Sequence, residues 1–286
     1  MRKWLLRILI VIGIVIVLIV GTAAVVLASS PLNRTYTVDV AMIDIPTDAE
    51  SIARGEHLVQ AVAVCTICHG QGLGGQLAFA DEFLGQVHTP NLTSGAGGVG
   101  ATYTDEDWIR AIRHGINPQG RGLIFMPNDS YFYLTDADLG AVIAYIKSLP
   151  PVDNTDAARN LTLPAQVMLT LGASGQVMRT ELIDHTAPRA TMSDGEYLVQ
   201  IGGCSFCHGN NLAGGQGLEP GAPPGPDLTQ GGVLDAYTLA EFTRAVRSGQ
   251  TLDGRVIDPV YMPWAGYSMM TNEEVEAIWD YLRALS

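Results

Sequence analysis

Two five-residue stretches of the chain follow one pattern, Cys65-Thr66-Ile67-Cys68-His69 and Cys204-Ser205-Phe206-Cys207-His208. Together they contain all four cysteines of the 286 residues. The thiols of each stretch are three positions apart and the histidine follows directly, so one helical turn brings the three side chains close together. What these side chains bind is decided by the residues around them, which repeat as well.

The CxxCH pattern is the attachment motif of c-type haem, in which two thiols add to the two vinyl groups and the adjacent histidine faces the iron. Three other uses of the cysteines are a disulfide in an oxidising compartment, a zinc site with four cysteine ligands and a thioredoxin-like redox pair. Two copies, each with a histidine and a downstream Met-Pro, favour haem. The sequence therefore predicts two covalently bound haem c groups, attached through Cys65, Cys68, Cys204 and Cys207 with His69 and His208 as iron ligands.

Further landmarks recur in the same order around both motifs, which indicates a duplicated domain. The paired segments are 55–60 with 195–200, 90–93 with 226–229, 110–113 with 244–247, 126–127 with 262–263 and 144–149 with 280–285. These landmarks predict one domain at 48–150 and a second at 191–286. The residues between them, 151–190, are predicted to be a linker with a short helix around 165–171.

Helix start and stop signals occupy matching places in the two repeats. Thr104-x-x-Asp107 and Thr238-x-x-Glu241 have the form of capping boxes, in which the hydroxyl accepts from an otherwise unpaired backbone N–H. Gly115 and Gly249 stand where a left-handed residue ends such a helix. Between the helices, Gly and Pro are frequent and no sustained alternation occurs, so the fold is predicted to be all-α without strands.

A sixth iron ligand is predicted at Met126 and Met262, which lie 61 residues after Cys65 and 58 after Cys204. Each precedes a proline, which stiffens the loop that carries the sulfur. A thioether favours ferrous iron, so His/Met ligation raises the reduction potential. Most methionines fill cores, and only these two share a repeat position. The alternative sixth ligands are His57, His88, His114 and His185.

At these residues the chain resembles the class I cytochrome c family, and more closely the membrane-anchored dihaem cytochromes c with two tandem class I domains. The resemblance covers about 48–150 and 191–286. It implies that the first and last helices of each domain cross where a glycine meets an aromatic ring, matched here by Gly55 with Tyr145 and by Gly195 with Tyr281.

The same resemblance implies that a proline after each motif offers its carbonyl to the histidine Nδ1–H. Pro90 and Pro226 match those positions, and such an acceptor orients the ring and increases its basicity as a ligand. The chain departs from soluble mitochondrial-type cytochromes c in having no lysine-rich docking ring, since Lys147 is the only lysine after the N-terminal segment. Their partners therefore do not carry over to it.

Two pairs of arginines occupy equivalent helix positions in the repeats. Guanidinium groups bind carboxylates bidentately, so these side chains are candidates for contacts with haem propionates. Solvation on a helix surface is the alternative interpretation of the same residues. The four candidates are Arg110, Arg113, Arg244 and Arg247.

The N-terminus carries an apolar segment from Ile8 to Ala28 without a charged side chain. Its 21 residues suffice to cross a hydrocarbon core of about 30 Å. Arg2, Lys3 and Arg7 precede it, and such positive flanks stay cytoplasmic. The sequence thus predicts an anchor at 1–30, a juxtamembrane linker at 31–47, and haem domains on the periplasmic side of the cytoplasmic membrane. The alternative is a signal peptide cleaved near Ala28-Ser29-Ser30, although such peptides have shorter apolar regions of about 7–15 residues.

The part of the chain after this segment is strongly acidic. It has 13 basic and 29 acidic residues, which give it a formal net charge of −16. This balance excludes nucleic acid as a partner and disfavours binding to an anionic membrane surface. It is compatible with simple solubility and with docking to a basic patch on a redox protein.

Three functions remain open to a chain of this kind. Two six-coordinate haems leave no open iron site, which favours electron transfer between a donor complex or dehydrogenase and an acceptor such as an oxidase, a reaction centre or another cytochrome, with no catalytic residue of its own. A dihaem peroxidase is the enzymatic alternative, and it needs one iron with an open or releasable position. A permanent cytochrome subunit of a dehydrogenase or quinol-oxidising complex is the third.

Overall fold

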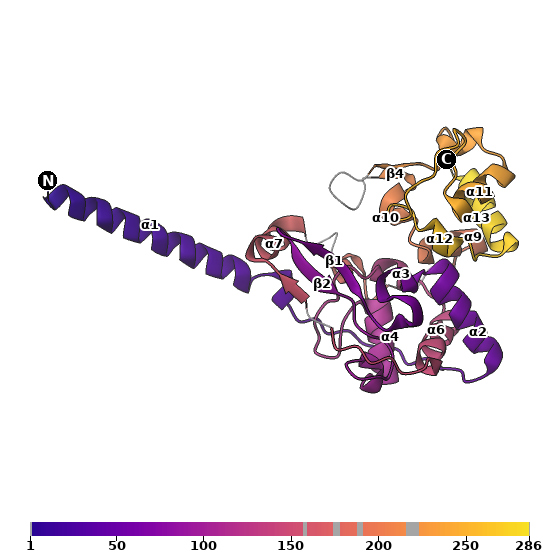
Figure 1. Cartoon of the computed structure of the whole chain (residues 1–286), viewed down its shortest axis with the longest axis horizontal. Helices are drawn as coiled ribbons and strands as arrows, with labels where there is room; N and C mark the ends of the chain where they lie inside the picture. Colours follow the sequence, from indigo (N-terminus) through magenta and orange to yellow (C-terminus); the bar gives the residue numbers. More distant parts are fainter. Residues whose placement is uncertain (1, 157–158, 174–177, 188–190, 216–222, 286) are drawn as a thin grey trace.

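A computed structural model of the chain describes residues 2–156, 159–173, 178–187, 191–215 and 223–285. A long apolar helix, α1 (Arg2–Ala28), extends from two compact helical units (Figure 1). Its segment Leu6–Ala28 is long and apolar enough to cross a membrane, and none of it is buried within the protein. The prediction of a mainly helical chain, with two similar units after one N-terminal apolar helix, is confirmed by this architecture.

The first unit contains a helix that leads into the first CxxCH motif, the motif helix, and three further helices. Its α-helices are α2 (Ala49–His57), α3 (Cys65–His69), α4 (Asp105–His114), α5 (Asn128–Tyr131) and α6 (Asp136–Ser148). It also has three 3-10 helices, η1 (Pro31–Asn33), η3 (Gln71–Leu73) and η4 (Val99–Ala101), and one π-helical turn, η2 (Leu58–Val62).

The second unit repeats this order. Its helices are α9 (Asp194–Ile201), α10 (Ser205–His208), α11 (Leu239–Ser248), α12 (Trp264–Tyr267) and α13 (Asn272–Ala284), with the 3-10 turn η7 (Val233–Ala236). The two units differ at the approach to the motif, where Cys65 follows Gly55 by ten residues but Cys204 follows Gly195 by nine. The turn η2 is a π-helix, which accommodates the extra residue of the first unit.

The expectation that strands are absent is wrong, although the strands are short. A three-stranded antiparallel sheet joins β1 (Leu77–Asp81), β2 (Gly85–His88) and β3 (Arg159–Leu161), and a two-stranded one joins β4 (Ala213–Gly215) and β5 (Gly225–Asp227). In the register, Asp81 pairs with Gly85 and Gly85 with Leu161. Strands of three to five residues are too short for alternation to be recognised, and β3 comes from a distant part of the chain.

The predicted helix boundaries are confirmed in both units. Thr104 and Thr238 cap α4 and α11 with complete capping boxes. Gly115 and Gly249 end these helices with φ of 69° and 67°, a conformation that favours glycine. Each helix therefore starts and stops where local hydrogen bonds satisfy its terminal backbone groups.

The predicted crossing of first and last helices is present in both units. A Cβ atom added at Gly55 would overlap the carbonyl oxygen of Ala141 on α6 and lie 2.9 Å from Cβ of Tyr145. Likewise, a Cβ at Gly195 would overlap the carbonyl of Ala277 on α13 and lie 2.7 Å from Cβ of Tyr281. Backbones approach this closely only where one partner has no side chain.

The linker folds against the first unit. It contains α7 (Leu163–Met168), continued by the π-turn η5 (Leu169–Ala173), so the short helix predicted around 165–171 is confirmed. It also contains the 3-10 helix η6 (Arg179–Leu182). Met178 is 1% exposed and its methyl group packs beside Gly122. The linker is therefore packed on the first unit where Met178 meets Gly122.

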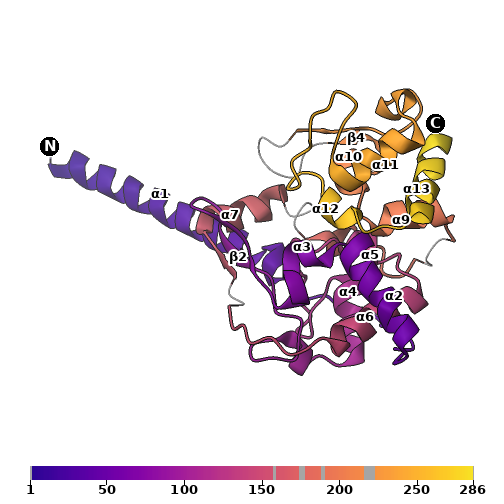
Figure 2. The same cartoon turned by 45° about the vertical axis from the view of Figure 1, so that its right-hand side comes forward.

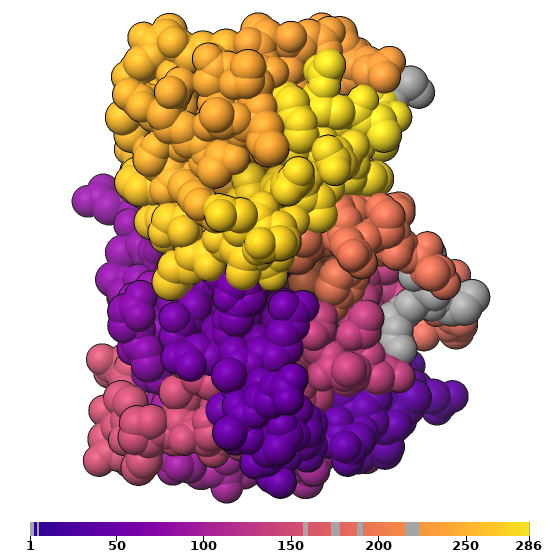
Figure 3. All heavy atoms as spheres, turned by 90° about the vertical axis from the view of Figure 1, so that its right-hand side faces the viewer, coloured from indigo at the N-terminus to yellow at the C-terminus, as the bar shows by residue number. Residues whose placement is uncertain are grey.

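One hydrophobic cluster runs through both units. Its fully buried members include Leu58, Ile109 and Ile143 in the first unit, and Ile201 and Val275 in the second. Helix α12 packs on η2, and α9 packs on α5. Figure 2 shows α12 and α9 on the side of the second unit that faces the first. In the space-filling view, the second unit covers the first without a layer between them (Figure 3). The two repeats thus form a single packed body.

The substitution Gly55→Ala is expected to destabilise the protein by about 1–3 kcal/mol, because overpacking against a neighbouring backbone forces the crossing helices apart. Thermal unfolding followed by circular dichroism measures the change. Gly13→Ala is the matched control, since a Cβ at Gly13 meets no atom within 4 Å. Equal melting temperatures for both variants would contradict the close crossing.

Candidate functional site

The first motif forms the short helix α3, held between two unusual backbone conformations. Val64, just before it, has φ of 43°, and Gly70, just after it, has φ of 75°. The chain therefore turns sharply into and out of the motif. Cys65 and Cys68 lie one turn apart on α3, and His69 is its last residue.

His69 is oriented by the proline that the sequence assigned to this role. Its Nδ1 lies 3.0 Å from the carbonyl oxygen of Pro90. Because a carbonyl oxygen only accepts, Nδ1 carries the proton and Nε2 keeps its lone pair for a metal. The ring is 9% exposed, and burial lowers its pKa, so the neutral form that binds iron is favoured.

The second motif has the same geometry. Nδ1 of His208 donates to the carbonyl oxygen of Pro226 across 2.8 Å. Burial again lowers the pKa of the histidine. The hydrogen bonds expected for Pro90 and Pro226 are therefore present in both units, and the donor chemistry of each motif fits haem c. The assignment of the residues to haem stays a prediction.

The segment that carries each proline packs tightly against its motif. Gly75 has φ of 80°, and a Cβ there would lie 2.7 Å from the carbonyl oxygen of Thr89 and 2.8 Å from the backbone nitrogen of Asn91. The Thr89 hydroxyl donates to the carbonyl of Cys68 at 2.7 Å. In the second unit, a Cβ at Gly225 would overlap the carbonyl of Cys207. The histidine acceptors are thus fixed by backbone packing.

Met126 and Met262 are half-buried at the edge of the hydrophobic cluster. Each precedes a proline and a one-turn helix, α5 or α12. The same turn follows both, since Asn128 N donates to the Met126 carbonyl at 2.8 Å and Trp264 N to the Met262 carbonyl at 2.7 Å. The repeat places the two methionines equivalently, and their role as sixth ligands stays a prediction.

Two buried tyrosines that sequence reasoning missed connect these elements. Tyr131 and Tyr267 each lie five residues after the methionine of their unit. Their hydroxyl groups donate to the carbonyls of Ala63 and Gly202, at 2.8 Å in both cases. Burial raises the pKa of both phenols well above the usual range, so they remain donors. The only signal in the sequence that could have identified them is their shared repeat position. A tyrosine in a short helix is otherwise indistinguishable from a residue that merely fills the hydrophobic core.

Three of the four alternative histidine ligands have polar partners outside the motifs. His57 Nε2 lies 2.8 Å from the carboxylate of Glu274. His114 Nδ1 lies 3.0 Å from His185 Nδ1, and Nε2 of His185 lies 3.3 Å from the hydroxyl of Thr180. His88 ends the strand β2. The contacts of the other three give them structural roles that need no iron.

Arg110 and Arg113, the candidate arginines of the first unit, make contacts with the protein itself. Arg110 pairs with Glu106 and Asp107 on its own helix, the latter at 2.7 Å. A guanidinium nitrogen of Arg113 donates to the carbonyl of Leu134 and to the carboxylate of Asp136, both at 2.9 Å.

In the second unit, Arg247 donates to the carbonyl of Met270 at 2.8 Å. It occupies the repeat position of Arg113, whose acceptor is also a main-chain carbonyl. These contacts show that Arg113 and Arg247 tie helices to neighbouring loops. Contact of Arg110, Arg113, Arg244 and Arg247 with haem propionates stays a prediction.

The geometry does not favour the other uses of the cysteines. No disulfide joins any two of the four cysteines. Burial raises the pKa of Cys65 and of Cys204 to about 12, whereas a redox-active pair needs a lowered thiol pKa. Across the described ranges of the chain, no three His, Cys, Asp or Glu side chains gather in a group that could hold a metal ion.

The two units contact each other through equivalent residues. His57 of the first unit pairs with Glu274 of the second, while the hydroxyl of Tyr197 donates to Asp138 at 2.6 Å. His57 and Tyr197 occupy one repeat position, and so do Asp138 and Glu274. The interface is therefore approximately twofold, and the acid at the third position of each last helix, Asp138 or Glu274, contacts the other unit.

Two helical units, each with a CxxCH helix, a histidine bound to a proline carbonyl and a Met-Pro turn, define a tandem c-type cytochrome. The chain belongs to the family described as cytochrome C oxidase, cbb3-type, subunit III, which matches residues 50–146 and 190–282. Both matched ranges contain one motif and one Met-Pro turn.

Several curated proteins are similar in sequence. The fructose dehydrogenase cytochrome subunit of Gluconobacter japonicus is 30% identical over 260 residues, 82% of this chain and 52% of that protein. The alcohol dehydrogenase (quinone) cytochrome c subunit of Gluconacetobacter polyoxogenes is 37% identical over 107 residues, 33% of this chain and 22% of that protein. A diheme cytochrome c-type protein of Cereibacter sphaeroides is 28% identical, over 81% of this chain and 84% of its own length.

The chain spans about half the length of the fructose dehydrogenase subunit, and a smaller part of the alcohol dehydrogenase subunit. It spans most of the Cereibacter sphaeroides protein. These names agree with the family match, which covers both cytochrome c units of the chain.

Proposed function

We propose that the chain binds two haem c groups and transfers single electrons as the tethered cytochrome subunit of a membrane-bound dehydrogenase. The observation that carries this proposal is the duplicated geometry in which each CxxCH histidine donates to a proline carbonyl, at 3.0 Å and 2.8 Å. A chain that uses the motif for metal-free redox or structural purposes has no need of an oriented histidine.

In each unit, different residues would attach the haem c group and bind its iron. In the first unit, Cys65 and Cys68 would attach the haem, and His69 Nε2 and the Met126 sulfur would bind its iron. Their equivalents in the second unit are Cys204, Cys207, His208 and Met262. Haem c, when bound, supplies a one-electron iron couple. The protein orients the histidine, surrounds the site with buried apolar residues and raises the potential with a thioether sulfur.

The packing of the two units supports electron exchange between them. A Cβ at Gly266 would lie only 2.4 Å from a methyl carbon of Val64, which directly precedes Cys65. Likewise, a Cβ at Gly202, two residues before Cys204, would lie 3.7 Å from the Val62 carbonyl oxygen. The backbone that leads into each motif is therefore part of the interface. We propose that electrons pass between the two sites through this contact.

The apolar helix α1 and the charge pattern support a location at the membrane. We propose that α1 remains as a single-pass anchor, that its basic end is cytoplasmic, and that both units lie outside the cytoplasm. Covalent haem attachment through CxxCH is consistent with that side of the membrane. The acidic units, with a formal charge of −16 for the part beyond the anchor, then face redox proteins with basic docking surfaces.

The relatives support two kinds of partner for the chain. Similarity to cytochrome subunits of fructose and alcohol dehydrogenases supports a permanent dehydrogenase partner that delivers electrons to the chain. Similarity to a diheme cytochrome c-type protein over most of its length supports a free carrier as the second candidate. Co-purification from detergent extracts without crosslinking separates them, because only a permanent subunit brings a stoichiometric dehydrogenase with it.

Replacement of a proposed sixth ligand tests the site directly. Met126→Ala is expected to lower the midpoint potential of one haem by a substantial part of the roughly 0.8 V range that axial ligands span, and to leave the other nearly unchanged. Spectroelectrochemical titration measures both potentials. Met168→Ala, a half-exposed methionine in the linker, is the control, and two unchanged potentials in Met126→Ala would refute the assignment. A large high-spin ferric fraction in the unaltered protein would favour a peroxidase instead.

Removal of one attachment thiol tests the haem count. Cys204→Ala is expected to reduce covalent haem to about one per chain, because a haem c group needs its thioether bonds for stable attachment. Haem staining and intact mass measure the stoichiometry against the unaltered protein. Unaltered covalent haem in the second unit would show that the motif has another use.

A further inference from the structure

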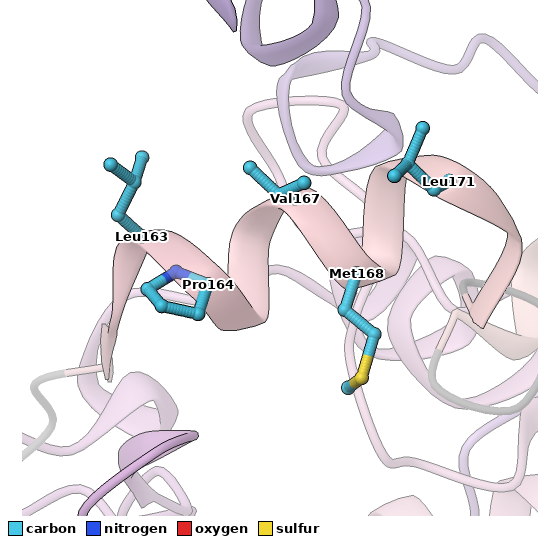
Figure 4. A pocket seen from close by; sticks show the side chains of 5 residues that line it. All are labelled: Leu163, Pro164, Val167, Met168 and Leu171. Atoms are coloured by element: carbon cyan, nitrogen blue, oxygen red, sulfur yellow. The ribbon is translucent and has the colours of Figure 1, made fainter.

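The linker helix presents an apolar face to the outside of the protein. Leu163, Met168 and Leu171 are 59%, 41% and 73% exposed. With Pro164 and Val167 they line a shallow, open apolar hollow on the surface of α7 and η5 (Figure 4). The segment 163–172 has no charged residue. We call these five residues the α7 face.

The polar side chains of this segment are already satisfied by its own backbone. Gln166 donates to the carbonyl of Leu161 at 3.0 Å, and Thr170 donates to the carbonyl of Gln166 at 2.7 Å. On the opposite side, Ala165 and Leu169 are buried against the protein. The α7 face therefore has no polar group that requires water, while its inner side is tied to the first unit.

The position of the α7 face identifies what covers it. Helix α7 packs against the end of α1, and η5 packs against η1, which directly follows α1. Both cartoon views place α7 beside the end of α1 nearest the units (Figures 1 and 2). If α1 spans a bilayer up to Ala28, then α7 lies at the level where acyl chains meet headgroups. The exposed apolar side chains of α7 therefore belong to a helix that is in direct contact with the apolar helix α1.

We propose that the α7 face is a second membrane contact, buried in the interfacial layer of the bilayer that α1 crosses. The segment 163–172, mostly apolar and without charge, is too short to span a hydrocarbon core, but it suits a helix lying in the membrane plane. Together, α1 and α7 hold the first unit at a fixed orientation to the bilayer. This inference rests on the proposed anchoring by α1.

Thiol accessibility of the full haem-loaded chain in phosphatidylcholine vesicles tests the proposal. Its four native cysteines are engaged in thioether bonds, so Leu171→Cys introduces a single free thiol. A membrane-impermeant maleimide is expected to alkylate it at least tenfold more slowly than Val260→Cys, a control residue that is 71% exposed in the second unit. Unfolding in detergent is expected to equalise the two rates.

The outcomes separate this inference from the anchoring on which it rests. Rapid alkylation of Leu171→Cys, with Val15→Cys in α1 protected, would overturn the α7 contact alone. Rapid alkylation at Val15 as well would overturn the anchoring. Protection of Leu171→Cys that disappears at one chain per vesicle would assign the face to a second copy, and would also overturn the lipid contact.

A second inference comes from an arginine in the linker. The guanidinium of Arg179 forms a bidentate pair with Asp129, at 2.9 and 2.7 Å. Its central carbon lies 3.9 Å from the ring centroid of Phe206. The side chain is 11% exposed, so both contacts are largely shielded from solvent.

Both partners of Arg179 belong to the candidate haem sites. Asp129 lies three residues after Met126 in the turn that carries the proposed sixth ligand, and Phe206 lies between Cys204 and Cys207. Neighbouring contacts fix the arginine, since Thr180 donates to the carbonyl of His114 at 2.7 Å and Met178 is buried. One cation thus contacts the methionine loop of the first unit and the attachment motif of the second.

We infer that Arg179 is a positioning residue that offsets the charge of Asp129 and so raises the potential of the first site. A negative charge near a haem stabilises the ferric form and lowers the potential, and a shielded guanidinium beside it cancels that effect. This inference rests on the proposed binding of haem to both motifs.

Redox titration of three variants tests it. Arg179→Met, which keeps the aliphatic stem, is expected to lower the potential of the first haem, because Asp129 is left uncompensated. Arg179→Lys is expected to retain most of the original value, and the double variant Arg179→Met/Asp129→Asn to return towards it. Arg283→Met is the control, since Arg283 pairs with Asp235 and lies over the Trp279 ring, and neither partner belongs to a CxxCH motif or a Met-Pro turn.

A purely structural role predicts a different pattern. The double variant would then shift at least as far as Arg179→Met, because two contacts would be lost, and that result would overturn the inference. Equal shifts in Arg179→Met and Arg283→Met would overturn it as well. A protein without two redox-active haems before any substitution would instead refute the proposed function.

Discussion

In each unit, the backbone of the first helix touches the backbone of the last helix at a glycine. A Cβ at Gly55 or Gly195 would overlap a carbonyl oxygen of the opposite helix, with Tyr145 or Tyr281 directly beside it. This contact fixes the direction in which the chain enters its CxxCH motif. The motif helix, the proline segment and the Met-Pro turn are then arranged around it, and Tyr131 and Tyr267 join the last of these to the turn before the motif.

Duplication places two such sites in one packed body. The residues that face the other unit come from the same repeat positions, so His57 meets Glu274 where Tyr197 meets Asp138. The chemistry of the two contacts differs although their positions match. The linker adds contacts that have no counterpart in the repeat, through Arg179 to the two sites and through α7 to the end of α1.

Local signals in the sequence predicted much of the fold. The capping boxes at Thr104 and Thr238 involve residues three positions apart, and the left-handed glycines follow directly after their helices, so no distant contact is needed to form them. The short strands escaped prediction because β3 pairs with β2 across more than 70 residues of sequence. The sequence shows one extra residue between Gly55 and Cys65, but it does not show that this residue is accommodated by the π-turn η2.

The sequence by itself determined the two CxxCH motifs, the duplication, the apolar N-terminal helix and the family, because these depend on residue type and spacing along the chain. The proline acceptors Pro90 and Pro226 were also named from sequence, through the resemblance. Only the tertiary structure decided which side chains meet: the tyrosine donors, the acids of the last helices that contact the other unit, and the position of Arg179 against Phe206. These pairings join residues far apart in sequence, and the packing of helices and linker alone brings them within hydrogen-bonding or van der Waals distance.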